Sequence, residues 1–186
     1  MESIFETVKR RFETKNLRYD QIDEEPVLRT GFGGKNGNFI AYAYVDDSRR
    51  LLEVQSMCPV NAPSNKRSAM AELLARINWT LTLGNFELDM NDGEIRFRTS
   101  VKLGQDDMDE EIVDHVVFAN FITMDRFFPA LTSVLYSNVS PEKALKTMAS
   151  QEESNDADKK AACHDTQPNN TRFGGRLGDL MGPSNN

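Results

Sequence analysis

The sequence is poor in the residues from which metal sites, disulfides and most catalytic centres are built. Its 186 residues include two cysteines, Cys58 and Cys163, and two histidines, His115 and His164. The cysteines are too far apart for a CxxC metal motif and too few for a disulfide framework, and no HxxxH spacing is present. No serine or cysteine stands in a nucleophile motif such as GxSxG. We therefore expect no metal, no cofactor and no catalytic residue.

Long apolar runs and an excess of positive charge are also lacking. No segment is apolar over the length that a membrane-spanning helix requires, and Met1 to Thr7 carries acids where a signal peptide carries basic residues. The chain has 29 acidic and 22 basic residues, a net charge of −7, so its long-range field repels the phosphates of nucleic acids. We expect a cytoplasmic protein that binds neither membranes nor nucleic acid.

The composition divides the chain into two parts. Residues 1–148 alternate apolar and polar positions with helical or strand periodicity, whereas residues 149–186 are rich in Gln, Glu, Ser, Asn, Asp, Lys and Gly. A segment of the second kind buries too little apolar surface to offset the entropy lost on ordering. We predict an α+β domain over residues 1–148 and a disordered polar tail over residues 149–186.

The apolar periodicities predict the order α-β-β-β-β-α-β-β-α and a last short helix. The expected helices cover residues 2–14, 64–81, 108–136 and 141–148, and the first four strands cover residues 17–22, 27–32, 39–45 and 51–57. An antiparallel sheet of about five or six strands, flanked by helices, is the fold that follows. Pro129 is expected to kink or break the third helix. The strand over 39–45 is apolar on both faces, which predicts a cover on each side, one of them a partner molecule.

A hairpin between Phe86 and Val101 is the most specific local prediction. Asp92-Gly93 is typical of a two-residue type I′ turn. The resulting pairs are Met90 with Ile95, Asp89 with Arg96, Leu88 with Phe97 and Glu87 with Arg98. Apolar residues then share one face of the hairpin and opposite charges share the other.

The glycine-rich segment Gly31 to Gly37 (GFGGKNG) is the strongest candidate for an anion-binding loop. A dinucleotide fingerprint needs glycine at position 36, and a P-loop needs serine or threonine there, but the residue is Asn36. A strand is expected to follow, so no helix N-terminus faces an anion. We interpret the segment as a hairpin turn.

Two charged runs are interpreted as ordinary features of helices and not as binding sites. The acids from Asp106 to Asp114 open the third long helix, where the helix dipole favours negative charge, and their spacing does not match a calcium-binding loop. The basic run Lys9-Arg10-Arg11 is interpreted as a solvated helix face.

Five aromatic residues are candidates for contact with a partner protein. Tyr42 and Tyr44 belong to the strand that requires a second cover, Trp79 lies off the apolar stripe of its helix, and Phe127 and Phe128 lie at the expected helix break. For Trp79 and the phenylalanine pair, a second packing cluster inside the monomer is the alternative.

Four segments resemble the YbjN family of bacterial proteins: 31–37, 83–89, 92–100 and 125–131. The resemblance covers about residues 13–146. It implies a fold similar to that of the type III secretion chaperones and a non-enzymatic domain described as a regulator of sensory transduction. The relatives in fold are acidic homodimers that hold extended peptides, and the resemblance supplies no catalytic residue.

From these observations we expect a homodimeric protein- or peptide-binding module, chaperone-like or regulatory, and not an enzyme. One alternative is a signalling adaptor that acts through the tail, where Phe173, Leu177 and Leu180 have the spacing of a docking helix. A second alternative is a small-molecule-binding protein or enzyme whose pocket gathers Arg29, Lys35, Asp89 and Arg98.

Overall fold

The structure is a computed structural model that describes residues 3–104 and 110–164. The chain divides into two compact units, Met1–Ala149 and Ser150–Asn186. The first unit contains the sheet and the three helices that cover it.

Six antiparallel strands form one sheet with the order β1-β2-β3-β4-β6-β5. The strands are β1 Tyr19–Gln21, β2 Val27–Gly33, β3 Asn38–Asp46, β4 Leu51–Met57, β5 Asn85–Leu88 and β6 Ile95–Lys102. The four helices are α1 Ile4–Thr14, α2 Arg67–Asn78, α3 Glu110–Tyr136 and α4 Pro141–His164. The α+β class, the antiparallel sheet and the order of elements predicted from periodicity are confirmed.

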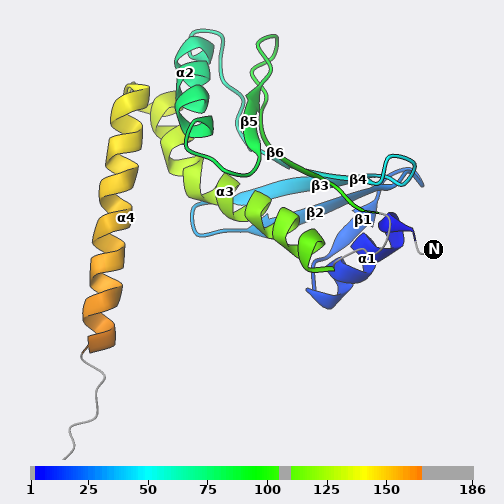
Figure 1. The fold of residues 1–186 in the computed structure, drawn as a ribbon. Coiled ribbons are helices and arrows are strands. Elements are labelled where there is room, and N and C mark those ends of the chain that lie inside the picture. The colour runs from blue at the N-terminus through cyan, green and yellow to red at the C-terminus, as the bar shows by residue number, and fades with distance from the viewer. Residues whose placement is uncertain (1–2, 105–109, 165–186) are drawn as a thin grey trace, which may run out of the picture. The chain divides into compact units, whose positions relative to one another are not determined.

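Helices α1, α2 and α3 cover the same face of the sheet (Figure 1). Alternate strand residues such as Leu28, Ala41 and Val54 point to this face and are at most 1% exposed. They pack against the apolar stripes of α1 and α3, whereas α2 packs against the β5–β6 hairpin. The unit therefore has two layers, helices and sheet, with the hydrophobic core between them.

A buried polar cluster fixes α3 to the middle of the sheet. The side chain of Asn120 is fully buried, and its Nδ2 donates to the carbonyl oxygens of Val54 at 2.9 Å and Phe97 at 3.0 Å. Its Oδ1 accepts from Ser56 Oγ at 2.5 Å, and Thr99 Oγ1 lies 3.2 Å from Nδ2. Because every member has a partner, the cluster is tolerated in the core and determines where α3 crosses β4 and β6.

Ion pairs between α1 and α3 correct the interpretation of Lys9-Arg10-Arg11 as a solvated helix face, whereas acids do lie in the first turn of α3 as predicted. Arg10 and Arg11 both pair with Glu110, and Arg11 and Lys15 pair with Asp114. The acids at 106, 107 and 109 lie outside the described residues. Burial alone would raise the pKa of Asp114, but hydrogen bonds from Arg11 and Lys15 outweigh it and lower that pKa. The ion pairs therefore hold α1 against α3, and the charged groups also face water.

We expect this ion-pair cluster to make stability depend on pH. A carboxylate whose pKa is lower in the folded than in the unfolded protein stabilises the fold above its unfolded pKa, and this contribution disappears as the pH falls through the folded pKa. Asp114→Asn should therefore cost about 1 kcal/mol near pH 7 and lose its effect progressively below about pH 4. Urea unfolding of both proteins between pH 2 and 7 measures this. Glu25→Gln is the control, because Glu25 is exposed and its carboxylate makes no hydrogen bond to the described residues. If the free energies of unfolding of wild type and Asp114→Asn differed by the same amount at every pH, the ion pairs of Asp114 would not be the cause.

The hairpin register is shifted by two residues from the predicted one. Leu88 pairs with Ile95, Glu87 with Arg96, Phe86 with Phe97 and Asn85 with Arg98. The turn is longer than two residues because the Asp89 side chain accepts from the backbone N–H of Asn91 at 2.7 Å and the N–H of Gly93 donates to the Asp89 carbonyl at 2.8 Å. A shift of two keeps each side chain on its face, so the separation of apolar and charged faces was predicted correctly and the partners were not.

Three helices also differ in extent or continuity from the sequence prediction. Helix α3 continues through Pro129 without a break, α2 starts at Arg67 and ends at Asn78, and α4 extends to His164 instead of ending near Met148. Residues 165–186, most of the predicted tail, lie outside the described residues.

Candidate functional site

Among the described residues of the first unit, Met1–Ala149, no helix packs on the second face of the sheet. On β3, Ile40, Tyr42 and Tyr44 point to this face, and Ile40 and Tyr44 are each 38% exposed. Their neighbours in the strand point to the core, so helices of the same unit supply one of the two covers predicted for β3. We call this surface, formed by the outward residues of all six strands, the open face.

The centre of the open face is apolar and aromatic. The rings of Tyr42 and Tyr44 stack with centroids 6.1 Å apart, and the pairing register puts Met57 of β4 beside Ile40 and Gln55 beside Tyr42. Burial, followed by the neighbouring Tyr42, raises the pKa of Tyr44. The Tyr44 phenol therefore stays protonated and able to donate a hydrogen bond at neutral pH.

Ion pairs cover the β5 side of the open face. Arg96 Nε lies 2.7 Å from Glu87 Oε2, Arg98 Nη1 lies 3.5 Å from Glu53 Oε2, and Arg98 also pairs with Glu87. Burial alone would raise the pKa of Glu87, but hydrogen bonds from Arg96 and Asn85 and the charge of Arg98 together lower it. Two cations meet two acids here, so this part of the face is neutral.

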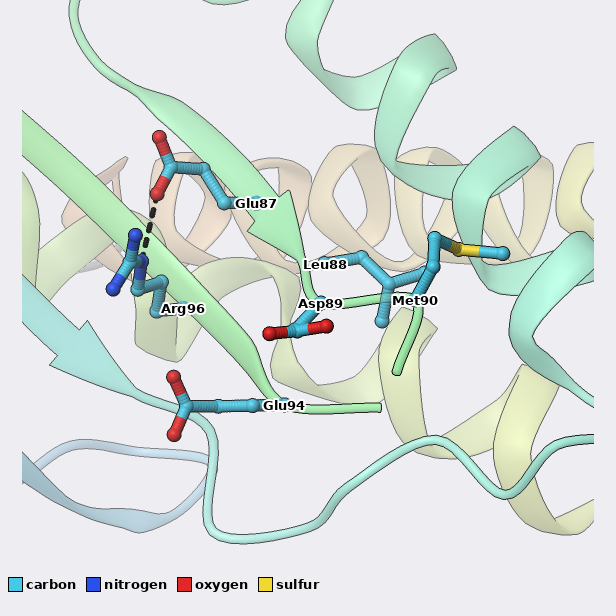
Figure 2. Close-up of a pocket in the computed structure, with 6 residues that line it drawn as sticks. All are labelled: Glu87, Leu88, Asp89, Met90, Glu94 and Arg96. Carbon is cyan, nitrogen blue, oxygen red and sulfur yellow. Dashed lines mark hydrogen bonds and ion pairs between the residues drawn. The ribbon is translucent and has the colours of Figure 1, made fainter. Parts of the chain in front are cut away.

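A hollow of about 420 Å³ lies beside the β5–β6 turn (Figure 2). It is lined by Glu87, Leu88, Asp89, Met90, Glu94 and Arg96. Figure 2 shows Met90 pointing away from the three carboxylates, and this side chain is 55% exposed. Hydrogen bonding to the backbone N–H of Asn91, partly opposed by burial, lowers the pKa of Asp89. Because the pKa values of Asp89 and Glu87 are both lowered, these two carboxyl groups are ionised at neutral pH.

The glycine-rich loop between β2 and β3 does bind an anion, and that anion is the Asp125 carboxylate of α3. The backbone N–H groups of Lys35 and Asn36 donate to it at 3.0 and 2.7 Å. An added Cβ at Gly34 would come within 2.1 Å of Asp125 Oδ1, so glycine is required for this close approach. The predicted hairpin turn is confirmed by the Gly34 N–H, which donates to the Gly37 carbonyl at 2.8 Å.

The same loop explains why α3 is not broken at Pro129. Proline has no N–H, so the carbonyl of Asp125, four residues earlier, loses its helical partner. The side chain of Asn36 replaces it, with Nδ2 donating to the Asp125 carbonyl oxygen at 2.9 Å. The loop and the helix therefore satisfy each other's unpaired backbone groups.

The sequence pattern of a family named YbjN, "Putative bacterial sensory transduction regulator", matches residues 5–133. The chain belongs to the YbjN family. A solved structure from E. coli, YbjN, described as "a putative transcription regulator", has the same fold, with a TM-score of 0.54 at 14% sequence identity. The alignment covers 71% of this chain and 94% of the E. coli chain. No curated protein shows significant similarity.

The segments that carried the YbjN resemblance form contacts inside the fold. Segments 31–37 and 125–131 meet at the Asp125 carboxylate, and segments 83–89 and 92–100 contain the two strands of the β5–β6 hairpin. Gly84 has a φ of 77°, and a Cβ there would lie 2.6 Å from the Arg98 carbonyl oxygen. The YbjN motifs of this chain are accordingly packing and turn motifs.

The five predicted partner-binding residues lie in three places. Tyr42 and Tyr44 lie together on the open face, whereas Trp79 is the C-cap residue that follows α2 and is 90% exposed. Phe127 is 3% exposed and packs edge-on against Phe86 inside the core. Phe128 is half-buried and packs against Phe39. The structure thus supports a monomer-core position for the phenylalanine pair.

Sequence reasoning missed other exposed apolar side chains. Ile40 shares the open face with the tyrosines, and its spacing of two residues from Tyr42 was the available signal. Ile122 of α3 is 64% exposed and Tyr136 is 67% exposed, and neither is distinguished by spacing from the buried residues of the same helix.

The remaining chemical candidates do not assemble into a site among the described residues. Burial raises the pKa of the Cys58 thiol and keeps it protonated. Across the described part of the chain, no three His, Cys, Asp or Glu side chains converge to hold a metal ion. Arg29 and Lys35 do not line the hairpin hollow with Asp89, so the four-residue pocket of the enzyme alternative is not assembled. No helix among the described residues has the length and apolar character needed to cross a bilayer.

Proposed function

We propose that this YbjN-family chain is a non-enzymatic regulator that works in the cytoplasm by binding a polypeptide, a partner protein or a second copy of itself. The open face supports this most directly. An apolar strip of Ile40, Tyr42, Tyr44 and Met57 lies uncovered between charged residues, which is the usual composition of an interface core within a polar rim. Tyrosine is enriched at such contacts because it offers apolar area together with a hydrogen-bonding group.

The charge distribution favours a protein over a nucleic acid as the partner. Overall the chain carries −7, and the arginines on the β5 side of the open face are matched by acids. Such a surface supplies little of the electrostatic attraction on which nucleic-acid binding depends.

A photo-crosslinking experiment in bacterial cells tests this function. Benzoylphenylalanine replaces Tyr44 or Ile40 in the full chain and, as a control, Ser68, an exposed residue of α2. We expect a discrete crosslinked polypeptide from positions 40 and 44 and none from position 68, because only the open face is occupied. Mass spectrometry then distinguishes a second copy of the chain from another protein. Absence of product at both test positions, in variants that unfold like wild type, would refute the proposal.

A truncated chain tests the tail alternative in the same experiment. Met1–Ala149 forms a compact unit, so a chain ending at Ala149 retains the open face. Unchanged crosslinking in that chain is expected, and its loss would show that the tail carries recognition.

A further inference from the structure

The two edge strands of the sheet differ in their capacity to accept another strand. At the β5 edge, the side chain of Asn78 from α2 acts as a substitute strand for Phe86. The Phe86 N–H donates to Asn78 Oδ1 at 2.8 Å, and Asn78 Nδ2 donates to the Phe86 carbonyl at 3.0 Å. The centre of the β5 edge is therefore closed.

At the β1 edge, no side chain of the described residues bonds to the outward backbone groups in this way. The Ile22 N–H donates to the Val27 carbonyl at 3.0 Å, and the register pairs Asp20 with Arg29. Since hydrogen-bonding directions alternate along an antiparallel strand, the N–H and C=O groups of Tyr19 and Gln21 point away from β2. Within residues 3–104 and 110–164, no strand, helix or turn pairs with them there. An extended polypeptide can bind to such an edge by main-chain hydrogen bonds.

A hollow of about 350 Å³ on the open face adjoins this edge and is cationic. Arg18, Asp20, Arg29, Gly31 and Ile40 are among its lining residues. Gly31 leaves its floor empty, because an added Cβ would have no neighbour nearer than the Phe39 carbonyl oxygen at 3.9 Å. Side chains from an added strand would find room there.

The charges around this hollow are not balanced. Arg29 lies 3.7 Å from Asp20, and both side chains are exposed, which makes the pair weak. Arg18 makes no ion pair with the described residues. Two guanidinium groups therefore face one carboxylate, in contrast to the matched pairs of Arg96 and Arg98 on the β5 side. A second carboxylate, supplied by a ligand, would balance the two positive charges.

We propose that the β1 edge takes an acidic, extended segment of a partner protein. The segment adds to the sheet as a strand antiparallel or parallel to β1, bonded to the main chain of Tyr19 and Gln21. Its acidic side chains on the open face lie toward Arg18 and Arg29. This inference rests on the proposed polypeptide-binding function and specifies the chemistry of the partner and the place where it binds.

Short synthetic peptides and the full-length chain provide the test. One fluorescent peptide alternates Glu with Val, and its matched control alternates Gln with Val. We expect the Glu peptide to bind about fivefold to tenfold more tightly, as two exposed ion pairs imply. The double variant Arg18→Gln/Arg29→Gln should remove this preference. Lys102→Gln, which deletes a cation elsewhere on the open face, should retain it.

Main-chain docking has its own measurement. Amide hydrogen exchange of Tyr19 and Gln21 in the native chain should slow when the Glu peptide is added, while exchange in β5 stays unchanged. Gln21→Pro deletes one outward N–H and should weaken both peptides alike, and the exchange measurement decides the question if this variant folds poorly. Equal binding of the Glu and Gln peptides, or no protection at β1, would overturn the inference. If benzoylphenylalanine at position 44 still crosslinked in Arg18→Gln/Arg29→Gln, the proposed binding function of the open face would stand without the β1-edge inference.

Discussion

Replacing Asn120 with alanine is expected to lower the free energy of unfolding by about 3 to 5 kcal/mol. The change removes the shared partner of the Ser56 hydroxyl and of the Val54 and Phe97 carbonyl oxygens, all enclosed between α3 and the sheet. It also leaves a cavity beneath the helix. Urea unfolding measures the effect, with an unchanged dependence on denaturant concentration as evidence that the folded state remains compact.

Two comparisons make the Asn120 result specific. Asn61→Ala removes an exposed amide and should change stability by no more than about 0.5 kcal/mol. Ser56→Ala introduced together with Asn120→Ala should cost less than the sum of the single changes, because the first replacement removes a group that the second leaves unpaired. Additive costs, or an Asn120→Ala loss as small as that of Asn61→Ala, would show that the buried cluster does not hold α3 to the sheet.

Asp125→Ala is expected to destabilise the chain by about 2 to 3 kcal/mol. The carboxylate accepts backbone N–H bonds from Lys35 and Asn36, and charge-assisted hydrogen bonds contribute about 1.5 to 3 kcal/mol each, reduced here because water reaches the exposed loop. Thermal unfolding detects the loss. Asp125→Asn should be intermediate, since its amide oxygen still accepts from one donor.

An added anion should partly reverse the Asp125→Ala defect. Removing the carboxylate leaves two converging N–H groups that formate can reach, and a ligand that binds only the folded state raises stability in proportion to the logarithm of its concentration. The melting temperature of Asp125→Ala should therefore rise with formate more than that of wild type or of Glu25→Ala. Equal responses in all three proteins would mean that the loop does not form an anion-binding concavity.

The sequence was sufficient to predict the local elements of this fold. The spacing of Ile4, Val8 and Phe12 predicted α1, and alternation in 27–32 and 39–45 predicted β2 and β3, because each pattern matches the period of its own backbone geometry. The hairpin partners were not obtained, since the side chain of Asp89 bonds to Asn91 and lengthens the turn. Several short turns are compatible with one alternating pattern.

The pair of tyrosines on the open face could be predicted because both belong to one strand, where alternation is a local signal. Tyr42 and Tyr44 were predicted as partner contacts because an apolar strand face needs a cover, and that role stays a prediction. Phe127 and Phe128 pack against Phe86 and Phe39 inside the fold. Local spacing gave no signal for contacts between residues far apart in the chain. Examples are the hydrogen bonds of Asp125 to the loop at 34–36 and the ion pair of Arg11 with Asp114. They follow from the tertiary fold, which brings together segments that are far apart in the sequence.

The bond from Asn36 to the Asp125 carbonyl also has a consequence for redesign of the chain. It makes the residue types at positions 36 and 129 interdependent, although 93 positions separate them, because the amide of one compensates for the missing N–H of the other. Introducing an ordinary helix-forming residue at 129 would give the carbonyl a backbone donor of its own, and replacing the asparagine side chain would then cost less stability. Replacing Asn36 first, with Pro129 still present, would leave the Asp125 carbonyl oxygen without its hydrogen-bond donor in the interior of α3.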